Sequence, residues 1–440
     1  MNLPDPTVSP PQTGGIRPLS PGRLRQLFNV RTLAEHRYRS GLILLILLVL
    51  VSLALASRPA ADPFAASAVT DPPFTSLTYG IQAFLWWDTG SVGMRLDQVR
   101  LMVFSHVKQI FAWEDIEARP GAINLRRADE ILGEIEQRDL KLVARLSDVP
   151  EWAHPSIAGH KDVDFIDAPP DPAYMDDWGN YCGAVAGRYA GRIAAYQIWN
   201  EPNLAREWGN RPPNAAEYVE LLRVCSEAIR AADPEAIIIS AGLSPTGNCC
   251  DIARPDDMYL QEMYDAGFQQ YVDVVGMHAP GYSAPHISPD EAEAQGSQRF
   301  FTFRRVEDLR RIMVSNGDAA RQVAILEVGW TTDIEGHNPN YSWFAVDADT
   351  QARYLVEAYE YAAEHWRPWV GLMSAIYMAD PSWQAEDEEY WWAIIGPNGR
   401  ARPAFIKLAN MAKYCGERVI PARAPNSPEA LGRVPVDPCD

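Results

Sequence analysis

Several signals are scarce or missing in this chain of 440 residues, and each absence disfavours a class of protein. The chain has only 6 cysteines and 8 histidines, and no spacing among them resembles a zinc site. The first apolar segment of the main domain is not followed by the glycine-rich turn of a doubly wound nucleotide-binding sheet. There is also no repeat at a solenoid period and no second folded domain.

Basic residues are outnumbered by acidic ones outside the N-terminal segment. Residues 1–40 carry six arginines and two acidic residues, whereas the formal charge of the whole chain is −19. The segment therefore has a net charge of +4, which leaves −23 on the remainder. A surface this acidic repels nucleic acid and anionic lipid, so we expect no nucleic-acid partner.

One apolar run is long enough to bear on location. Residues 41–57 contain no charged side chain, and their length is at the short end of what crosses a bilayer. The arginines precede this run, which predicts a cytoplasmic basic tail over 1–40, a transmembrane signal anchor over 41–57 and a main domain outside the cytoplasm. A cleavable signal peptide is the alternative, because Ala54-Leu-Ala56 resembles a cleavage site, but the long segment before the run favours the anchor.

An exported domain can form disulfides, although their connectivity cannot be read from the sequence. The cysteines stand at positions 182, 225, 249, 250, 415 and 439. Cys249 and Cys250 are neighbours in the chain, and we do not expect them to bridge each other.

The rest of the chain alternates short apolar runs with longer amphipathic segments. Residues 58–75 form an Ala/Pro-rich linker, 76–415 carry the alternation, and 416–440 form a Pro-rich C-terminal strap. The predicted strands are Leu77–Phe84, Met102–Phe111, Lys141–Leu146, Ala194–Trp199, Ala236–Ala241, Val272–Met277, Gln322–Val328 and Gly371–Tyr377. Predicted helices are Leu125–Gln137, Pro172–Tyr189, Ala215–Ala232, Met258–Ala266, Phe303–Ser315 and Ala348–His365. This α/β pattern favours a single (β/α)8 TIM barrel.

Two glutamates lie where the active site of such a barrel assembles, at the C-terminal ends of strands. Glu201 follows the fourth predicted strand and Glu327 lies near the end of the seventh. Two carboxyl groups that flank one bond are what glycoside hydrolysis requires. Taken singly, Glu327 could form a buried ion pair and Glu201 could be an exposed loop carboxylate. Together they predict a catalytic pair.

The segment Tyr196-Gln-Ile-Trp-Asn-Glu-Pro-Asn203 strengthens this interpretation. It resembles the signature of the clan A retaining glycoside hydrolases, and the resemblance extends from Tyr79 to about Lys413. The chain looks nearest to the β-xylosidase and α-L-iduronidase branch and to membrane-anchored endoglycosidases associated with exopolysaccharides. The resemblance implies that Glu201 is the acid/base and Glu327 the nucleophile, that Asn200 binds the sugar 2-hydroxyl, and that no metal or organic cofactor is needed.

The same resemblance points to further substrate contacts. His278 and Tyr282 occupy the strand-six position, whose tyrosine usually orients the nucleophile in the family. The family commonly has His-x-Tyr there, whereas this chain reads His278-Ala-Pro-Gly-Tyr282, so the role of Tyr282 stays open. Trp383 after the last strand is expected to stack on the sugar, or else to cap the core. The remaining substrate-binding candidates are Lys108, Trp113, Arg145 and Trp330. Lys108 could instead pair with a buried acid, and Arg145 could neutralise Glu327 or a structural acid.

The sequence therefore predicts a retaining O-glycosyl hydrolase that cleaves β-glycosidic bonds of an oligo- or polysaccharide outside the cytoplasm. The β-xylosidases of this branch carry an accessory β-sandwich, which is missing here, and this favours a substrate handled near the membrane. Two alternatives remain open: a catalytically idle barrel that binds polysaccharide, and a transglycosylase that uses the same residues.

Overall fold

The structure is a computed structural model that describes residues 39–47, 62–157 and 167–422. The chain divides into two units, Met1–Ala61 and Asp62–Asp440. In the first unit residues 39–47 are helical, while most of the predicted tail and residues 48–57 of the predicted membrane span lie outside the described residues. No helix in the described part of the chain is both long and apolar enough to cross a membrane.

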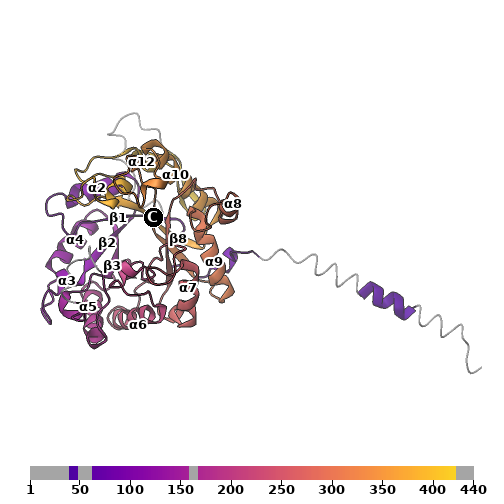
Figure 1. Ribbon diagram of the computed structural model, residues 1–440, viewed down its shortest axis with the longest axis horizontal. Coiled ribbons are helices and arrows are strands. Elements are labelled where there is room, and N and C mark those ends of the chain that lie inside the picture. The colour runs from indigo at the N-terminus through magenta and orange to yellow at the C-terminus, as the bar shows by residue number, and fades with distance from the viewer. Residues whose placement is uncertain (1–38, 48–61, 158–166, 423–440) are drawn as a thin grey trace, which may run out of the picture. The chain divides into compact units, whose positions relative to one another are not determined.

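The second unit is built on a closed barrel of eight parallel strands in sequential order, which confirms the predicted (β/α)8 barrel. Figure 1 looks onto this barrel, with the helices arranged around the strands. The strands are β1 (Thr78–Ala83), β2 (His106–Ala112), β3 (Lys141–Ser147), β4 (Ala195–Ile198), β5 (Ile238–Ile239), β6 (Val274–Pro280), β7 (Gln322–Gly329) and β8 (Val370–Met378).

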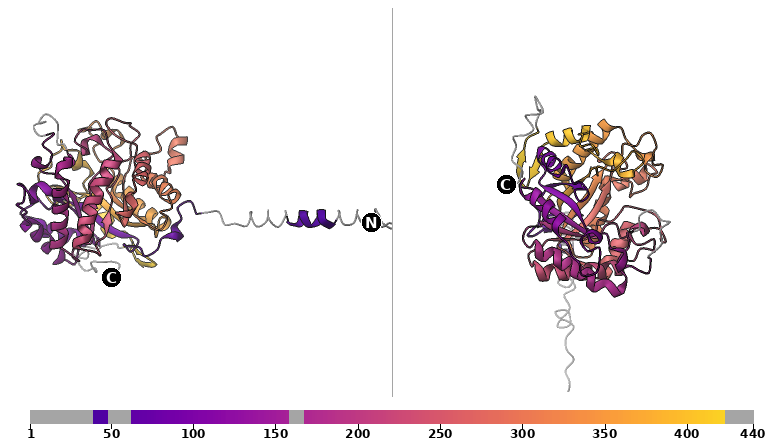
Figure 2. Two further views of the ribbon diagram at one scale, coloured as in Figure 1. Left: turned by 90° about the horizontal axis from the view of Figure 1, so that it is seen from below. Right: turned by 90° about the vertical axis from the view of Figure 1, so that its left-hand side faces the viewer.

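Helices follow the strands and cover the outside of the barrel (Figure 2). The α-helices are α2 (Val92–Leu101), α3 (Trp113–Ile116), α4 (Arg126–Glu136), α5 (Met175–Arg188), α6 (Ala215–Ala232), α7 (Asp256–Asp265), α8 (Pro289–Ala294), α9 (Val306–Ser315), α10 (Ala348–His365), α11 (Glu388–Trp392) and α12 (Pro403–Asn410). Short 3₁₀ turns include η5 (Ala205–Glu207) and η8 (Ser342–Phe344). All six predicted helices are present, four of them within a few residues of the predicted ends; the other two, at 172–189 and 303–315, each begin as a short 3₁₀ turn before α5 and α9.

Local sequence explains how the longer helices begin and which face they bury. The side chain of Asn214 accepts hydrogen bonds from two backbone N–H groups at the start of α6. The side chain of Asp347 accepts a hydrogen bond from one backbone N–H group at the start of α10. Apolar residues three and four apart then pack against the strands. Inside the barrel, small and branched side chains such as Val143, Ile239 and Leu372 form a separate buried layer.

β2 and β5 differ most from the predicted strands. β2 begins at His106 because Met102 still belongs to the end of helix α2, where its backbone N–H bonds to the last turn. β5 keeps only Ile238 and Ile239 of the predicted six residues. In both cases an apolar run alone does not distinguish a strand from the packed helix end or loop beside it.

Part of the predicted linker packs on the barrel. Phe64 stacks on Trp369 with ring centroids 5.9 Å apart, and its carbonyl accepts a hydrogen bond from Arg310. At the other end, β9 (Lys413–Cys415) and β10 (Arg418–Ile420) form a two-stranded antiparallel sheet, so the predicted strap begins as a hairpin. Its remainder, 423–440, lies outside the described residues.

The disulfides correct one expectation. Cys182 on α5 bridges Cys225 on α6, which ties together the two helices on either side of β4. Cys249 and Cys250 are also bonded to each other, contrary to the expectation that these neighbours would not pair.

Candidate active site

Glu201 lies in a tight turn directly after β4. Its φ is 36° and that of Trp199 is 70°, so two non-glycine residues of this turn adopt the left-handed region. Such residues typically cost about 1–3 kcal/mol each and persist where the surroundings enforce them. Here the Glu201 N–H donates to the carbonyl of Gly242, and the indole of Trp199 donates to the carbonyl of Glu207. The turn directs the Glu201 carboxyl into the barrel mouth.

A β-bulge places Glu327. Along β7, Ala324 and Leu326 face the barrel interior, whereas Ile325 and Val328 pack outward against the helices. Strict alternation would therefore send residue 327 outward. The register against β6 shifts at this point, because Met277 pairs with Ile325 but the next residue, His278, pairs with Glu327. The extra residue turns Glu327 inward, and it is the only residue of β7 that is not fully buried.

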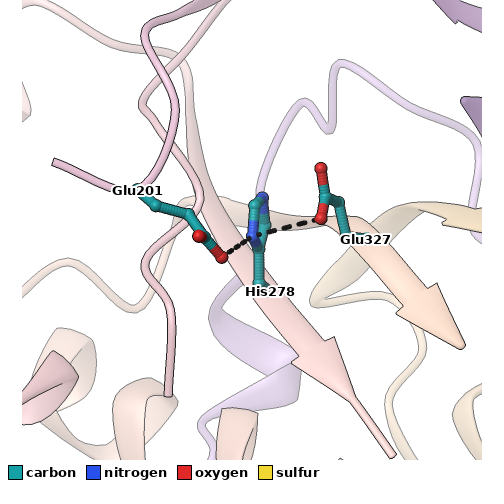
Figure 3. Close-up of side chains that lie close together, drawn as sticks. All are labelled: Glu201, His278 and Glu327. Carbon is teal, nitrogen blue, oxygen red and sulfur yellow. Dashed lines mark hydrogen bonds and ion pairs between the residues drawn. The ribbon is translucent and has the colours of Figure 1, made fainter. Parts of the chain in front are cut away.

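His278 on β6 stands between the two carboxyl groups (Figure 3). Its Nδ1 lies 2.8 Å from Oε1 of Glu201 and 3.6 Å from Oε2 of Glu327. The ring occupies this place because residue 242 is a glycine. A Cβ at Gly242 would overlap the imidazole. The imidazole is 1 % exposed, so its position is set by packing as well as by the two carboxylates.

Each carboxylate also has its own cation. Lys108 on β2 donates from Nζ to Oε1 of Glu327 at 3.1 Å, and it is buried. Arg206 in η5 donates from Nη2 to Oε2 of Glu201 at 3.2 Å, and its side chain is about half exposed. An ionised carboxylate in an apolar strand requires such compensation. Glu327 therefore has both features that the sequence suggested for it, a buried ion pair and a second glutamate nearby.

These partners set the charge of the site. Burial raises the pKa of the Glu201 carboxyl, but the hydrogen bond and charge of His278 and the charge of Arg206 outweigh burial and lower the pKa to about 2. Burial likewise raises the pKa of Glu327, and the charges of His278 and Lys108 lower it below its usual value. Burial lowers the pKa of Lys108 to about 8, an effect opposed by Glu327.

The two carboxyl groups converge. One oxygen from each glutamate and a nitrogen of His278 all lie within 4.8 Å of one another. Separations of about 5–5.5 Å characterise retaining glycosidases, and about 6.5–9.5 Å characterise inverting ones. These three groups are also of the kinds that bind metal ions. However, Lys108 and Arg206 already supply positive charge to both carboxylates, and this opposes the binding of a further cation.

The tyrosine beside Glu327 is not the expected one. Tyr377 on β8 places its hydroxyl 3.4 Å from Oε2 of Glu327. Tyr282 instead packs among aromatic rings, with centroids 4.7 Å from Phe301 and 4.6 Å from Phe344. The two extra residues between His278 and Tyr282, relative to His-x-Tyr, carry the tyrosine past the carboxylate.

Trp383 lies near this tyrosine. It is partly exposed, and its ring packs edge-on against Tyr377 at 5.6 Å and Phe84 at 4.7 Å. It therefore stands beside the aromatic residue that contacts Glu327. Asn200 is buried next to Glu201, and its Oδ1 finds no hydrogen-bond partner within the described residues. A buried carbonyl oxygen without a partner is available to a ligand hydroxyl.

Two predicted substrate contacts are core residues, which is a correction. Trp113 is fully buried, donates its indole N–H to Glu117 and stacks on Tyr181. Trp330 is fully buried and donates to the carbonyl of Ser283. Neither offers a ring face to a sugar.

Arg145 is directed toward structural acids instead of Glu327. Its Nη2 lies 3.9 Å from carboxylate oxygens of both Asp148 and Asp167, and its Nε donates to Ser147. This is the second of the two roles that the sequence left open for it. Burial of the guanidinium opposes its charge, but the neighbouring acids, Asp148 first, raise the pKa of Arg145.

Two residues near the carboxylates were not predicted from the sequence. Arg206 lies in the same loop as Glu201, five residues further on, and an arginine so close to a predicted acid was a usable signal. Tyr377 was the last residue of the eighth predicted strand, so the rule that active-site residues lie at strand ends already pointed to it.

The comparisons with known proteins agree with this geometry at the level of the fold. No family model and no curated protein matches the chain. Among solved structures, a family 39 glycoside hydrolase from the gut symbiont Bacteroides cellulosilyticus WH2 is similar, with a TM-score of 0.55 and 16% identity over 80% of this chain. This chain spans 64% of that protein's length.

Two further structures are similar to about the same degree. GH5_18 from Streptomyces cattleya, in complex with GlcNAc, has a TM-score of 0.53 and 15% identity over 76% of this chain and 79% of its own. A GH10 endoxylanase from a sugarcane soil metagenome has a TM-score of 0.51 and 15% identity over 80% of this chain and 100% of its own. The chain therefore has the barrel fold of these glycoside hydrolases.

Proposed function

We propose that this chain is a retaining glycoside hydrolase that cleaves β-glycosidic bonds of an oligo- or polysaccharide. The observation that carries the proposal is the approach of Glu201 and Glu327 to within 4.8 Å at the mouth of the barrel. Glu201 directly follows β4 and Glu327 lies near the end of β7, which supports the roles that the sequence resemblance implies for them.

In the first step a carboxylate oxygen of Glu327 attacks the anomeric carbon. The bond from that carbon to the glycosidic oxygen breaks, and Glu201 donates its proton to the departing oxygen. In the second step Glu201 takes a proton from water, the water oxygen bonds to the anomeric carbon, and Glu327 leaves. Two inversions give net retention, and the carboxylates supply all the acid–base and nucleophilic chemistry.

The first step requires a proton on Glu201, whereas the ligand-free site keeps this group ionised. His278 and Arg206 both stabilise the charged form. Substrate binding must therefore be coupled to proton uptake by Glu201. It does this by weakening one of these contacts and by excluding water from the carboxyl group.

Neighbouring residues have matching roles in this proposal. The unpartnered Oδ1 of Asn200 accepts a hydrogen bond from the sugar 2-hydroxyl, and Tyr377 and Lys108 hold the Glu327 carboxylate for attack. Trp383 provides an apolar wall beside Tyr377 for the sugar ring. Hydrogen bonds to the 2-hydroxyl that strengthen in the transition state contribute several kcal/mol in such enzymes.

We further propose that the domain works outside the cytoplasm, held by residues 41–57. The disulfide between Cys182 and Cys225 supports an oxidising compartment, because such bonds are rare in the cytosol. Fractionation of cells that express the full chain tests this. Recovery in the membrane fraction, with the barrel accessible to external protease, is expected, whereas release of a chain that begins near Ser57 would indicate a cleaved signal peptide.

Activity is tested by assay of residues 62–440 on a panel of aryl β-glycosides and β-linked polysaccharides. Glu327→Ala and Glu201→Ala should each lose at least about 1,000-fold in turnover, because neither role can be taken by another group. Azide should restore part of the activity in both: as a nucleophile that replaces Glu327, giving an α-glycosyl azide, and as an acceptor in the Glu201 variant, giving a β-glycosyl azide.

Glu357→Ala on the outer face of α10 is the matched control, since this glutamate pairs only with exposed Arg353 among the described residues. It should keep full activity. Unchanged turnover in a folded Glu327→Ala variant would refute the assignment. Transfer to added acceptor sugar in preference to water would identify a transglycosylase that uses the same carboxylates.

A further inference from the structure

Trp343, in the loop between β7 and α10, is unusually exposed for a tryptophan. Its side chain is 59% exposed. The indole N–H donates to the carbonyl of Asn340 at 3.0 Å, so the polar group of the ring is already satisfied. Only the apolar surface of the ring is left for a ligand, and tryptophan is enriched at binding interfaces.

The ring is also held in place. It packs edge-on against Phe301 at 4.9 Å and Phe344 at 4.7 Å, and it lies nearly parallel to Tyr282 at 6.1 Å. These contacts come from the loop after β6 and from its own loop. A flat apolar surface that is fixed before binding loses little conformational entropy when a ligand stacks on it.

A chain of polar contacts connects this loop to Glu201. Tyr341, two residues before Trp343, accepts a hydrogen bond from Nη1 of Arg206 at 3.2 Å. The other terminal nitrogen of Arg206 bonds to Glu201. Glu388, in the region after β8, lies 3.9 Å from the same guanidinium. Residues that follow β4, β7 and β8 therefore meet on one side of Glu201.

That side is where the leaving group departs, because the acid must reach the glycosidic oxygen. The polar groups of Arg206 and Tyr341 lie next to Glu201, and the apolar ring of Trp343 lies beyond them. Sugar residues present both hydroxyls and flat C–H faces, and this order of polar and apolar surfaces suits a saccharide chain that extends from the cleaved bond.

We propose that Trp343 is the stacking platform of a leaving-group subsite for a pyranose ring, so that the preferred substrate carries at least two sugars beyond the cleaved bond. This inference rests on the proposed glycosidase function. It commits to saccharide as the occupant because the exposed ring shares its loop with Tyr341, which is hydrogen-bonded to Arg206 beside Glu201.

The test isolates the leaving-group side by use of the glycosyl-enzyme. A 2,4-dinitrophenyl 2-deoxy-2-fluoro-β-glycoside of the sugar that the enzyme hydrolyses best should trap the covalent intermediate. Reactivation is then measured with acceptors: methyl β-glycosides as monosaccharides, and cellobiose, xylobiose, laminaribiose and mannobiose as disaccharides. The best disaccharide should reactivate the glycosyl-enzyme at a half-maximal concentration about 10-fold lower than that of the best monosaccharide, because it makes one more aromatic contact.

Trp343→Ala should abolish this advantage while it leaves reactivation by water within about 2-fold, and Trp343→Phe should retain most of it because an aromatic face remains. Ile406→Ala, which removes an exposed apolar side chain on α12, is the control and should change nothing. Thermal melting confirms that each variant is folded.

Two results would overturn the inference, and only the second would also reject the proposed glycosidase function. An intermediate that forms normally but is reactivated equally by monosaccharide and disaccharide, or equally in wild type and Trp343→Ala, rejects the subsite alone. Failure to form any intermediate with every activated glycoside rejects the proposed function and, with it, the subsite.

Discussion

Lys108 donates a hydrogen bond from Nζ to Oε1 of Glu327 at 3.1 Å, although 219 residues separate them in the chain. The lysine comes from β2 and the glutamate from β7, so closure of the barrel is what brings them together. In the proposed reaction this contact keeps the nucleophile ionised and oriented.

Lys108→Met should therefore raise the pKa of Glu327, since it removes one of the two charges that lower it. Glu327 must be ionised to attack, so activity is lost as the pH falls through its pKa. The acidic limb of the kcat profile, which reports the substrate complex, should move to higher pH, and the maximum should fall about 100-fold, as for loss of other preorganised charge contacts. An unmoved acidic limb in a folded variant would contradict the role of Lys108.

Arg206→Gln should shift the opposite limb. Arg206 helps to lower the pKa of Glu201, so its removal raises that pKa. The acid must be protonated to act, and activity is lost as the pH rises through its pKa. The basic limb of the kcat profile, which reports the substrate complex in which Glu201 holds its proton, should therefore move to higher pH. Arg206→Lys, which keeps a charge, should move it less, and a shift to lower pH in Arg206→Gln would contradict the account.

Gly242→Ala tests how His278 is positioned. The new methyl group would overlap the imidazole, so the ring must move away from both carboxylates. Displacement of this size should lower kcat/KM by about 100-fold. The melting temperature should fall too, since overpacking costs about 1–3 kcal/mol. Gly183→Ala on α5 is the control, because its Cβ would make only ordinary contacts, and it should leave activity unchanged.

The sequence predicted more of the fold than of the site. Eight apolar runs separated by helical segments were enough for the barrel, because strand and helix periodicity are local properties. The position of Glu327 at the mouth was predicted from its place near a strand end. The bulge at Leu326 that turns it inward was not, because a register shift depends on the neighbouring strands.

The site residues that sequence reasoning misplaced share a cause. Trp113 and Trp330 lie next to strand ends, but their rings turn into the core, where other aromatic residues pack around them. Whether a side chain at a strand end faces the mouth or the helices is a tertiary property. The disulfide pairing of Cys182 with Cys225 could not be predicted from the sequence for the same reason.

That disulfide should contribute measurable stability. It closes a loop of 43 residues between α5 and α6, so the double variant Cys182→Ala/Cys225→Ala should lose about 2–4 kcal/mol in the free energy of unfolding. Denaturant titration measures this. Cys249→Ser/Cys250→Ser is the control and should lose little, because a bond between neighbours closes no chain loop. Equal losses in the two variants would show that loop closure is not the source of the stabilisation.

The central claim is that Glu327 becomes covalently bonded to the substrate, and peptide mapping of the trapped enzyme tests it most directly. After reaction with the activated 2-deoxy-2-fluoro-β-glycoside, mass spectrometry should find one fluoroglycosyl group per chain, on the peptide that contains Glu327. A label on any other residue, or hydrolysis of the natural substrate to a first product of inverted anomeric configuration, would contradict the account.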